Sequence, residues 1–156
     1  MPTENIHLVT LETSGNQATI FSTNKLRNII GASELIHRVG TEYVKRAIQK
    51  TTGRNFKVED ICKETPIEEP GAPDIEVVIA TSGKALLLAR GKDLAKKFIT
   101  EWSRIIVHEA PGIDAFAVYS KDPVDLGDKN SFARAYKETM KDHSRAKMNQ
   151  DRKSVV

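Results

Sequence analysis

The sequence predicts an α+β domain with the element order β-α-β-β-α-β, followed by a helical tail. Two segments, residues 26–50 and 94–106, have apolar residues at helical spacing, and the β-rich segments 6–12 and 113–119 flank the array. Two short apolar runs in the middle are separated by only two residues, which is the signature of a β-hairpin. A chain of 156 residues with 39% hydrophobic residues suits one domain with a substantial core.

The first strand is predicted over residues 6–12, before the turn-forming cluster at residues 13–17. The helical pattern that follows contains Gly31, so a short helix is expected before this glycine and the main helix over residues 32–50. Apolar positions continue on both sides of Gly31, which predicts close packing or an unusual backbone angle there. A bulky residue in place of Gly31 is therefore expected to destabilise the fold.

The long connection over residues 51–74 lacks periodicity and contains three prolines, with a short helix expected near residues 58–63. Residues 75–81 and 84–90 are the hairpin strands on either side of Ser82-Gly83. The second helix has one apolar stripe and ends before Pro111-Gly112. Residues 125–148 are compatible with a helix but weakly apolar, so loose packing is expected.

Right-handed crossovers then give an antiparallel sheet of order 4-1-3-2 with both helices on one face, the ferredoxin-like layout. We expect this domain to span residues 1–122. Residues 123–156 are expected to form a basic helical tail or linker that continues into a longer protein. Between residues 128 and 153 there are eight Lys or Arg and four Asp or Glu, against a net charge of +3 for the whole chain.

Several functional classes are disfavoured. The single cysteine, Cys62, excludes an internal disulfide and a cysteine-built zinc site, and the four histidines have no metal-ligand spacing. The apolar runs are too short to cross a bilayer and residues 1–7 do not resemble a signal peptide, so a cytoplasmic protein without membrane partners is expected. The segments predicted as central strands carry no aromatic residue on which RNA bases could stack.

A nucleotidyl-transferring palm domain of this layout needs carboxylates at the end of its first strand and at its hairpin, because these hold two divalent cations. Glu12 ends the first strand. The sequence resembles the first palm of the large subunit of type III CRISPR effector complexes, of the Cmr type or a related CRISPR polymerase-like protein. The segments that carry the resemblance are 11–21, 25–27, 31–36, 80–88 and 110–113, which include Ser-Gly-Asn-Gln after Glu12 and Gly-Ala-Ser-Glu-Leu-Ile.

The resemblance also shows what this chain lacks. Active palms of the family carry Gly-Gly-Asp-Asp at the hairpin, where this chain has Thr81-Ser82-Gly83-Lys84. A lysine at a metal-ligand position repels a divalent cation, and Glu12 alone is a weak metal candidate. The resemblance therefore implies a non-catalytic palm (a pseudoenzyme) in antiviral defence. Its implied partners are a second palm, from the same parent chain or a homodimer, a nucleotide such as ATP without Mg²⁺, and RNA-guided effector subunits.

The nucleotide site that this reading implies consists of Glu12, Ser14, Gly15, Asn16, Gln17, Ser33, Ser82, Gly83 and Lys84. Turn N–H groups and one ammonium can hold phosphates, but the same residues also suit a plain turn and an ordinary hairpin lysine. Two other functions stay open. One is an active cyclase or oligonucleotide synthase that uses Glu12 with Asp74 or Asp114, and the other is an interaction module without a nucleotide.

Overall fold

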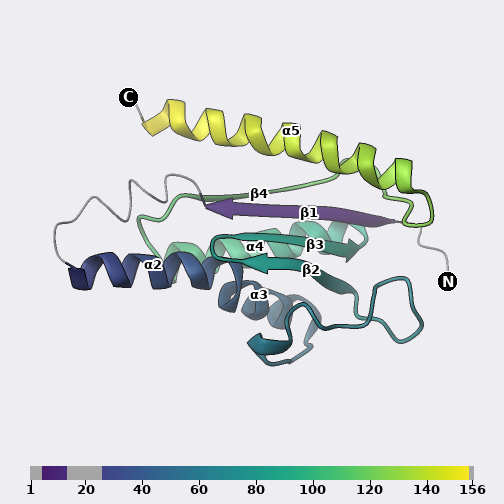
Figure 1. Ribbon diagram of the computed structural model, residues 1–156, viewed down its shortest axis with the longest axis horizontal. Coiled ribbons are helices and arrows are strands. Elements are labelled where there is room, and N and C mark those ends of the chain that lie inside the picture. The colour runs from purple at the N-terminus through teal and green to yellow at the C-terminus, as the bar shows by residue number, and fades with distance from the viewer. Residues whose placement is uncertain (1–4, 14–25, 155–156) are drawn as a thin grey trace.

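The computed structural model describes residues 5–13 and 26–154, and its elements are shown in Figure 1. The described part of the chain contains four strands and four α-helices with one short 3₁₀ helix, which confirms the α+β class. They are β1 (Ile6–Thr13), α2 (Leu26–Gly40), α3 (Glu42–Thr52), η1 (Val58–Asp60), β2 (Ile75–Thr81), β3 (Lys84–Arg90), α4 (Lys92–Glu109), β4 (Ala115–Tyr119) and α5 (Lys129–Ser154).

The strands form one antiparallel sheet in the order β2-β3-β1-β4, which is the predicted order 4-1-3-2 read from the other edge. β2 and β3 are joined by the predicted two-residue turn at Ser82-Gly83. Gly83 has φ of 74°, a left-handed conformation that glycine adopts without a steric penalty. The Thr13 N–H donates to Gly83 O at 2.8 Å, so the end of β1 is fastened to the hairpin turn.

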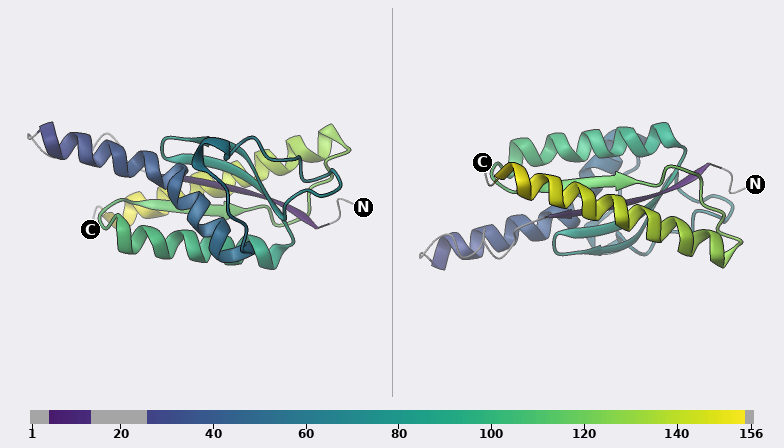
Figure 2. Two further views of the ribbon diagram at one scale, coloured as in Figure 1. Left: turned by 90° about the horizontal axis from the view of Figure 1, so that it is seen from below. Right: turned by 90° about the horizontal axis from the view of Figure 1, so that it is seen from above.

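Helices α2, α3 and α4 lie on one face of the sheet, as predicted for the helices of the βαββαβ unit (Figure 2). Alternate residues of β1, such as Val9 and Leu11, point toward this helical layer and join its apolar core. Trp102 on α4 is fully buried there and donates its indole N–H to Val39 O at 3.0 Å. This contact joins α4 to α2.

Helix α5 covers the other face of the sheet and packs on β1 and β4 (Figures 1 and 2). The strand residues Ile6, Leu8, Leu86 and Leu88 form a second apolar cluster on this side, and Phe132 and Ala135 of α5 pack against it. Farther along the same helix, the buried side chains are polar: Thr139 and His143. The weakly apolar segment is thus a helix that contributes buried residues to the domain.

The expectation for Gly31 was wrong. Helix α2 runs without a break through this residue, and a Cβ added to Gly31 meets no atom within 4 Å. The helical segment breaks instead at Thr41, between α2 and α3, directly after Gly40. Gly40 is the close-packed glycine: a Cβ there would overlap Thr81 O and lie 2.9 Å from both Lys84 N and Lys84 O.

Smaller differences concern the ends of elements. The short helix predicted near residues 58–63 is confirmed as η1, and the last strand begins two residues later than predicted, at Ala115. Among the described residues, no helix is both long and apolar enough to cross a membrane.

Candidate functional site

The end of β1 that meets the hairpin turn carries the candidate site. The strand register places Glu12 opposite Lys84 on β3 and opposite Phe116 on β4. Lys84 Nζ lies 3.4 Å from Glu12 Oε1, which makes an ion pair between the two predicted residues. The side chain of Lys84 is 63% exposed and that of Glu12 only 18%. The ammonium therefore faces solvent at the rim, with the carboxylate beneath it.

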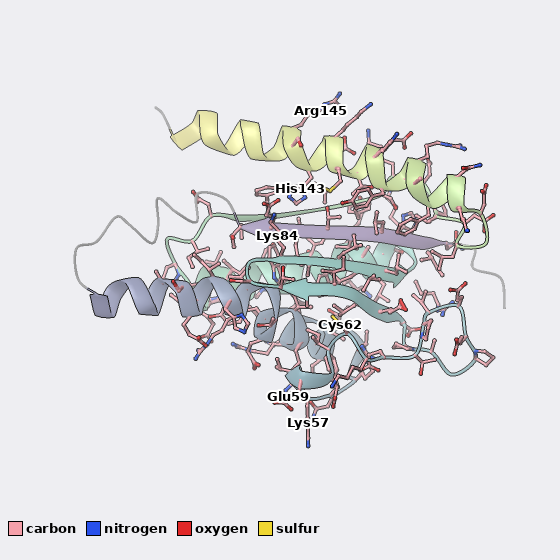
Figure 3. All side chains as sticks on the ribbon, viewed as in Figure 1. Lys57, Glu59, Cys62, Lys84, His143 and Arg145 are labelled. Atoms are coloured by element: carbon pink, nitrogen blue, oxygen red, sulfur yellow. The ribbon has the colours of Figure 1, made fainter. Side chains whose placement is uncertain are left out.

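Helix α5 supplies a third member, His143. Its Nε2 lies 2.8 Å from Glu12 Oε2, and its Nδ1 lies 3.0 Å from Thr10 Oγ1. An ionised carboxylate only accepts hydrogen bonds, so Nε2 carries a proton, and in the neutral ring Nδ1 accepts the Thr10 hydroxyl proton. The imidazole packs edge-on against Phe116, with ring centroids 4.5 Å apart. Figure 3 shows His143 reaching from α5 toward the sheet, close to Lys84.

The arrangement satisfies Glu12 without a metal. One carboxylate oxygen is bound by an ammonium and the other by an imidazole N–H, so both oxygens have protein partners. A divalent cation would have to displace these groups and would be repelled by Lys84. Within residues 5–13 and 26–154, no cluster of three or more His, Cys, Asp or Glu side chains is arranged to hold a metal ion. The described side chains therefore do not fit a two-metal centre.

The other predicted site residues divide into three groups. Ser82 is exposed and Gly83 forms the turn, so both lie beside the ion pair. Ser33 is exposed on α2, seven residues before Gly40, the glycine that touches the hairpin. This separation is about 10 Å along the helix axis, so Ser33 is not brought to Glu12. Ser14, Gly15, Asn16 and Gln17 lie outside the described residues.

The two acids considered for an active enzyme lie at opposite ends of the sheet. Asp74 immediately precedes β2, next to Arg90, and its Oδ1 lies 3.5 Å from Arg90 Nε. The register pairs Arg90 with Ile6, so Asp74 is a whole strand length away from Glu12. Asp114 is exposed and immediately precedes β4, whose first residue pairs with Thr13. Only Asp114 is therefore at the Glu12 end.

His143 and Thr10 were not among the residues predicted for the site. Thr10 alternates with Leu11 on β1, so it was placed on the sheet but had no recognisable partner. His143 continues a helical stripe that begins with Phe132, Ala135 and Thr139. This spacing could have indicated the role of His143, because it places the residue on the same face of α5 as Phe132 and Ala135, the face that meets the sheet.

Sequence comparisons give no relative: no protein-family model and no curated protein matches the chain. Solved structures do match. A Csm1–Csm4 cassette in complex with AMPPNP has 13% identity and a TM-score of 0.64, and the match covers 95% of this chain and 20% of that chain. The apo Csm1–Csm4 cassette has 13% identity and a TM-score of 0.55, covering 83% and 18%.

Csm1 from T. onnurineus has 17% identity and a TM-score of 0.61, and the match covers 93% of this chain and 20% of that chain. At such identities the likeness establishes the fold. The chain spans only about a fifth of the length of these proteins. The structural neighbours are Csm1 proteins, large subunits in type III CRISPR systems, and the chain has the α+β fold of a segment of them.

Proposed function

We propose that this chain is a non-catalytic palm of a type III CRISPR large-subunit-like protein, which binds a nucleotide and docks a second palm in antiviral defence. The observation that supports it best is the state of Glu12. This carboxylate has the position of the acid at the end of the first strand, yet it is paired with Lys84 and His143. A palm that holds its acid in this way has no carboxylate left to bind two cations.

Nucleotide binding is supported by the neighbours and by the exposed lysine. Csm1–Csm4 cassettes are known in complex with AMPPNP and with one ATP. In this chain, α5 covers the face of the sheet that carries Glu12, so the open approach is from the hairpin turn. Lys84 lies at that approach and has three N–H donors, of which Glu12 occupies one side. We place the triphosphate there, next to residues 14–17, without magnesium.

Two protein partners belong to the proposal. The edge strand β2 exposes Val78 and Ile79 beside the hairpin, and a second palm that covers this edge would bury both side chains. Several of the neighbours are Csm1–Csm4 cassettes, which supports assembly of the parent protein with further effector subunits. The second palm can come from the same parent protein or from a second copy of this chain.

The isolated chain is expected to form no cyclic or linear oligonucleotide from ATP, because the two-metal clamp is missing. Incubation with ATP and Mg²⁺ or Mn²⁺, followed by chromatography, measures this. Turnover that disappears in both Glu12→Gln and Asp114→Asn would contradict the proposal and establish an active cyclase built on these two acids. Asp74→Asn is the matched control, since Asp74 lies at the far end of the sheet.

ATP is expected to bind weakly at the hairpin, with an affinity that falls as salt rises and depends little on magnesium. Lys84→Gln should weaken binding about fivefold, because one ammonium–phosphate contact contributes roughly 1 kcal/mol at an exposed site. Lys129→Gln, at the exposed start of α5, is the matched control and should leave the affinity unchanged. Calorimetry measures both variants. Equal losses in the two variants would show that ATP senses only the overall charge, and would contradict a hairpin site.

A further inference from the structure

A hollow lies at the opposite end of the sheet from Glu12, where α4 begins. It has a volume of about 780 Å³, and its lining includes His7, Gly91, Lys92, Lys97 and Lys121. In β1, His7 is five residues before Glu12, which separates the two places by roughly 17 Å. This hollow is therefore independent of the proposed nucleotide site.

His7 is a buried imidazole with one free nitrogen. Only 4% of the residue is exposed, and its Nδ1 lies 2.8 Å from the backbone oxygen of Ser120. A carbonyl oxygen only accepts, so Nδ1 carries the proton and the orientation of the ring is fixed. No group in the described part of the chain bonds to Nε2, and this atom is not among the fully buried, unpaired ones, so Nε2 is open to the hollow that His7 lines. An imidazole that is held by one nitrogen and open to a hollow at the other can exchange a hydrogen bond with a ligand bound there.

The start of α4 offers further donors to the same hollow. This helix has 18 residues, and its N-cap, Gly91, has no side chain with which to cap the first N–H groups. The first bond inside the helix is from Ala95 N to Gly91 O at 3.2 Å, so the N–H groups of residues 92–94 precede the helical ladder. Such N–H groups, together with the positive end of the helix dipole, bind anions.

The charges of the lining also favour an anion. Lys92, Lys97 and Lys121 form no ion pair with any side chain in the described part of the chain. Arg90 and Asp74, which also line the hollow, pair with each other at 3.5 Å. Asp93 is then the one remaining carboxylate against three ammonium groups. The hollow thus combines a net positive charge with N–H donors and one imidazole.

We infer that the hollow at the start of α4 binds a phosphate group, held by the N–H groups of residues 92–94, by His7 Nε2 and by the surrounding lysines. The imidazole suits phosphate because Nε2 can accept the proton of a P–OH group, or can donate to a P–O⁻ oxygen once it is protonated. Inorganic phosphate and a phosphate monoester, such as a 5′-phosphorylated nucleoside, present this same group.

The test is an NMR titration of the whole chain with inorganic phosphate, AMP and adenosine in turn. Phosphate is expected to shift the amide signals of residues 92–94 and the His7 ring signals, and AMP should shift the same signals if a monoester is accepted. Adenosine should shift none of them. Equal affinity for phosphate and AMP means that the hollow recognises only the phosphate group, whereas tighter binding of AMP identifies a nucleoside monophosphate as the ligand. Shifts confined to the amide signals of α5 would overturn the inference.

Two variants show whether the named groups act together. The double change Lys92→Gln and Lys121→Gln removes two exposed charges and should weaken phosphate binding about tenfold, while Lys129→Gln should not change it. His7→Asn keeps a donor for Ser120 O but removes Nε2, and it should weaken binding at unchanged salt dependence. Because His7 is buried, the lysine variant decides the question if His7→Asn does not fold. Binding unaffected by the lysine variant would overturn the inference, and so would an equal loss with Lys129→Gln. The Lys84→Gln variant distinguishes the nucleotide site at the hairpin from this hollow, because it should weaken ATP binding at the hairpin but leave phosphate binding at α4 unchanged.

Discussion

Replacing Gly40 with alanine is expected to destabilise the fold by about 3 kcal/mol, which is at the upper end of the usual cost of overpacking. The added Cβ would overlap Thr81 O and lie 2.9 Å from both Lys84 N and Lys84 O. These are backbone atoms of the β2–β3 hairpin, so no side-chain rotation can relieve the overlap. Either α2 or the hairpin has to move. Urea denaturation followed by circular dichroism measures the loss.

Gly31→Ala is the matched control, because both glycines belong to α2. A Cβ at Gly31 meets no atom within 4 Å, and alanine has the higher helix propensity. This variant is expected to be as stable as the parent or to gain about 0.5–1 kcal/mol. If Gly40→Ala were as stable as Gly31→Ala, the close approach of α2 to the hairpin would be refuted.

His143→Ala is expected to cost about 2–4 kcal/mol, since it combines a cavity with the loss of two hydrogen bonds, one of them to the buried Thr10 hydroxyl. The imidazole bonds to Glu12 at 2.8 Å and to Thr10 at 3.0 Å, and it fills the space next to Phe116. Its removal leaves the Thr10 hydroxyl without a hydrogen-bond partner, and it leaves Lys84 as the one remaining partner of Glu12 among the described side chains. Denaturant unfolding measures the cost, and hydrogen exchange of α5 amides should become faster.

The control for His143 is His108→Ala. His108 is exposed near the end of α4 and is expected to change the free energy of unfolding by less than about 0.5 kcal/mol. A stability for His143→Ala within that range would mean that α5 is not held on the sheet by this residue. Unchanged hydrogen exchange in α5 would contradict the contact in the same way.

The parts of the fold that the sequence predicted are those set by local chemistry. Ser82-Gly83 can only connect adjacent antiparallel strands, so β2 and β3 were predicted with the bounds that the structure has. The handedness of crossovers then fixed the sheet order. The sequence could not show which of the two glycines, Gly31 or Gly40, is close-packed. Whether a glycine is close-packed depends on the hairpin that approaches it, and the hairpin is 41 or more residues farther along the chain.

The candidate site was predictable only where it follows from strand pairing. Glu12 and Lys84 were both selected, and the register does place them opposite each other. The sequence could not show that His143 contacts Glu12, because the two are 131 residues apart. In addition, the positions before His143 on the same face of α5 are the small Ala135 and the polar Thr139. The weak apolar pattern of α5 gave no strong indication that the helix packs on the sheet. Ser14–Gln17 keep their predicted role, as part of the proposal.

The two-sided sheet has a consequence for the order in which the molecule can fold. β1 is synthesised well before α5, the helix that covers its second face, and contacts such as Thr10–His143 close a loop of more than a hundred residues. Contacts of this separation form late, because the chain must first lose the entropy of closing the loop. Until α5 docks, Leu8, Leu86 and Leu88 are a solvent-facing apolar patch on a partly folded nascent chain. A ribosome-bound intermediate with such a patch is a natural substrate for a chaperone, and docking of α5 is the step that removes the patch.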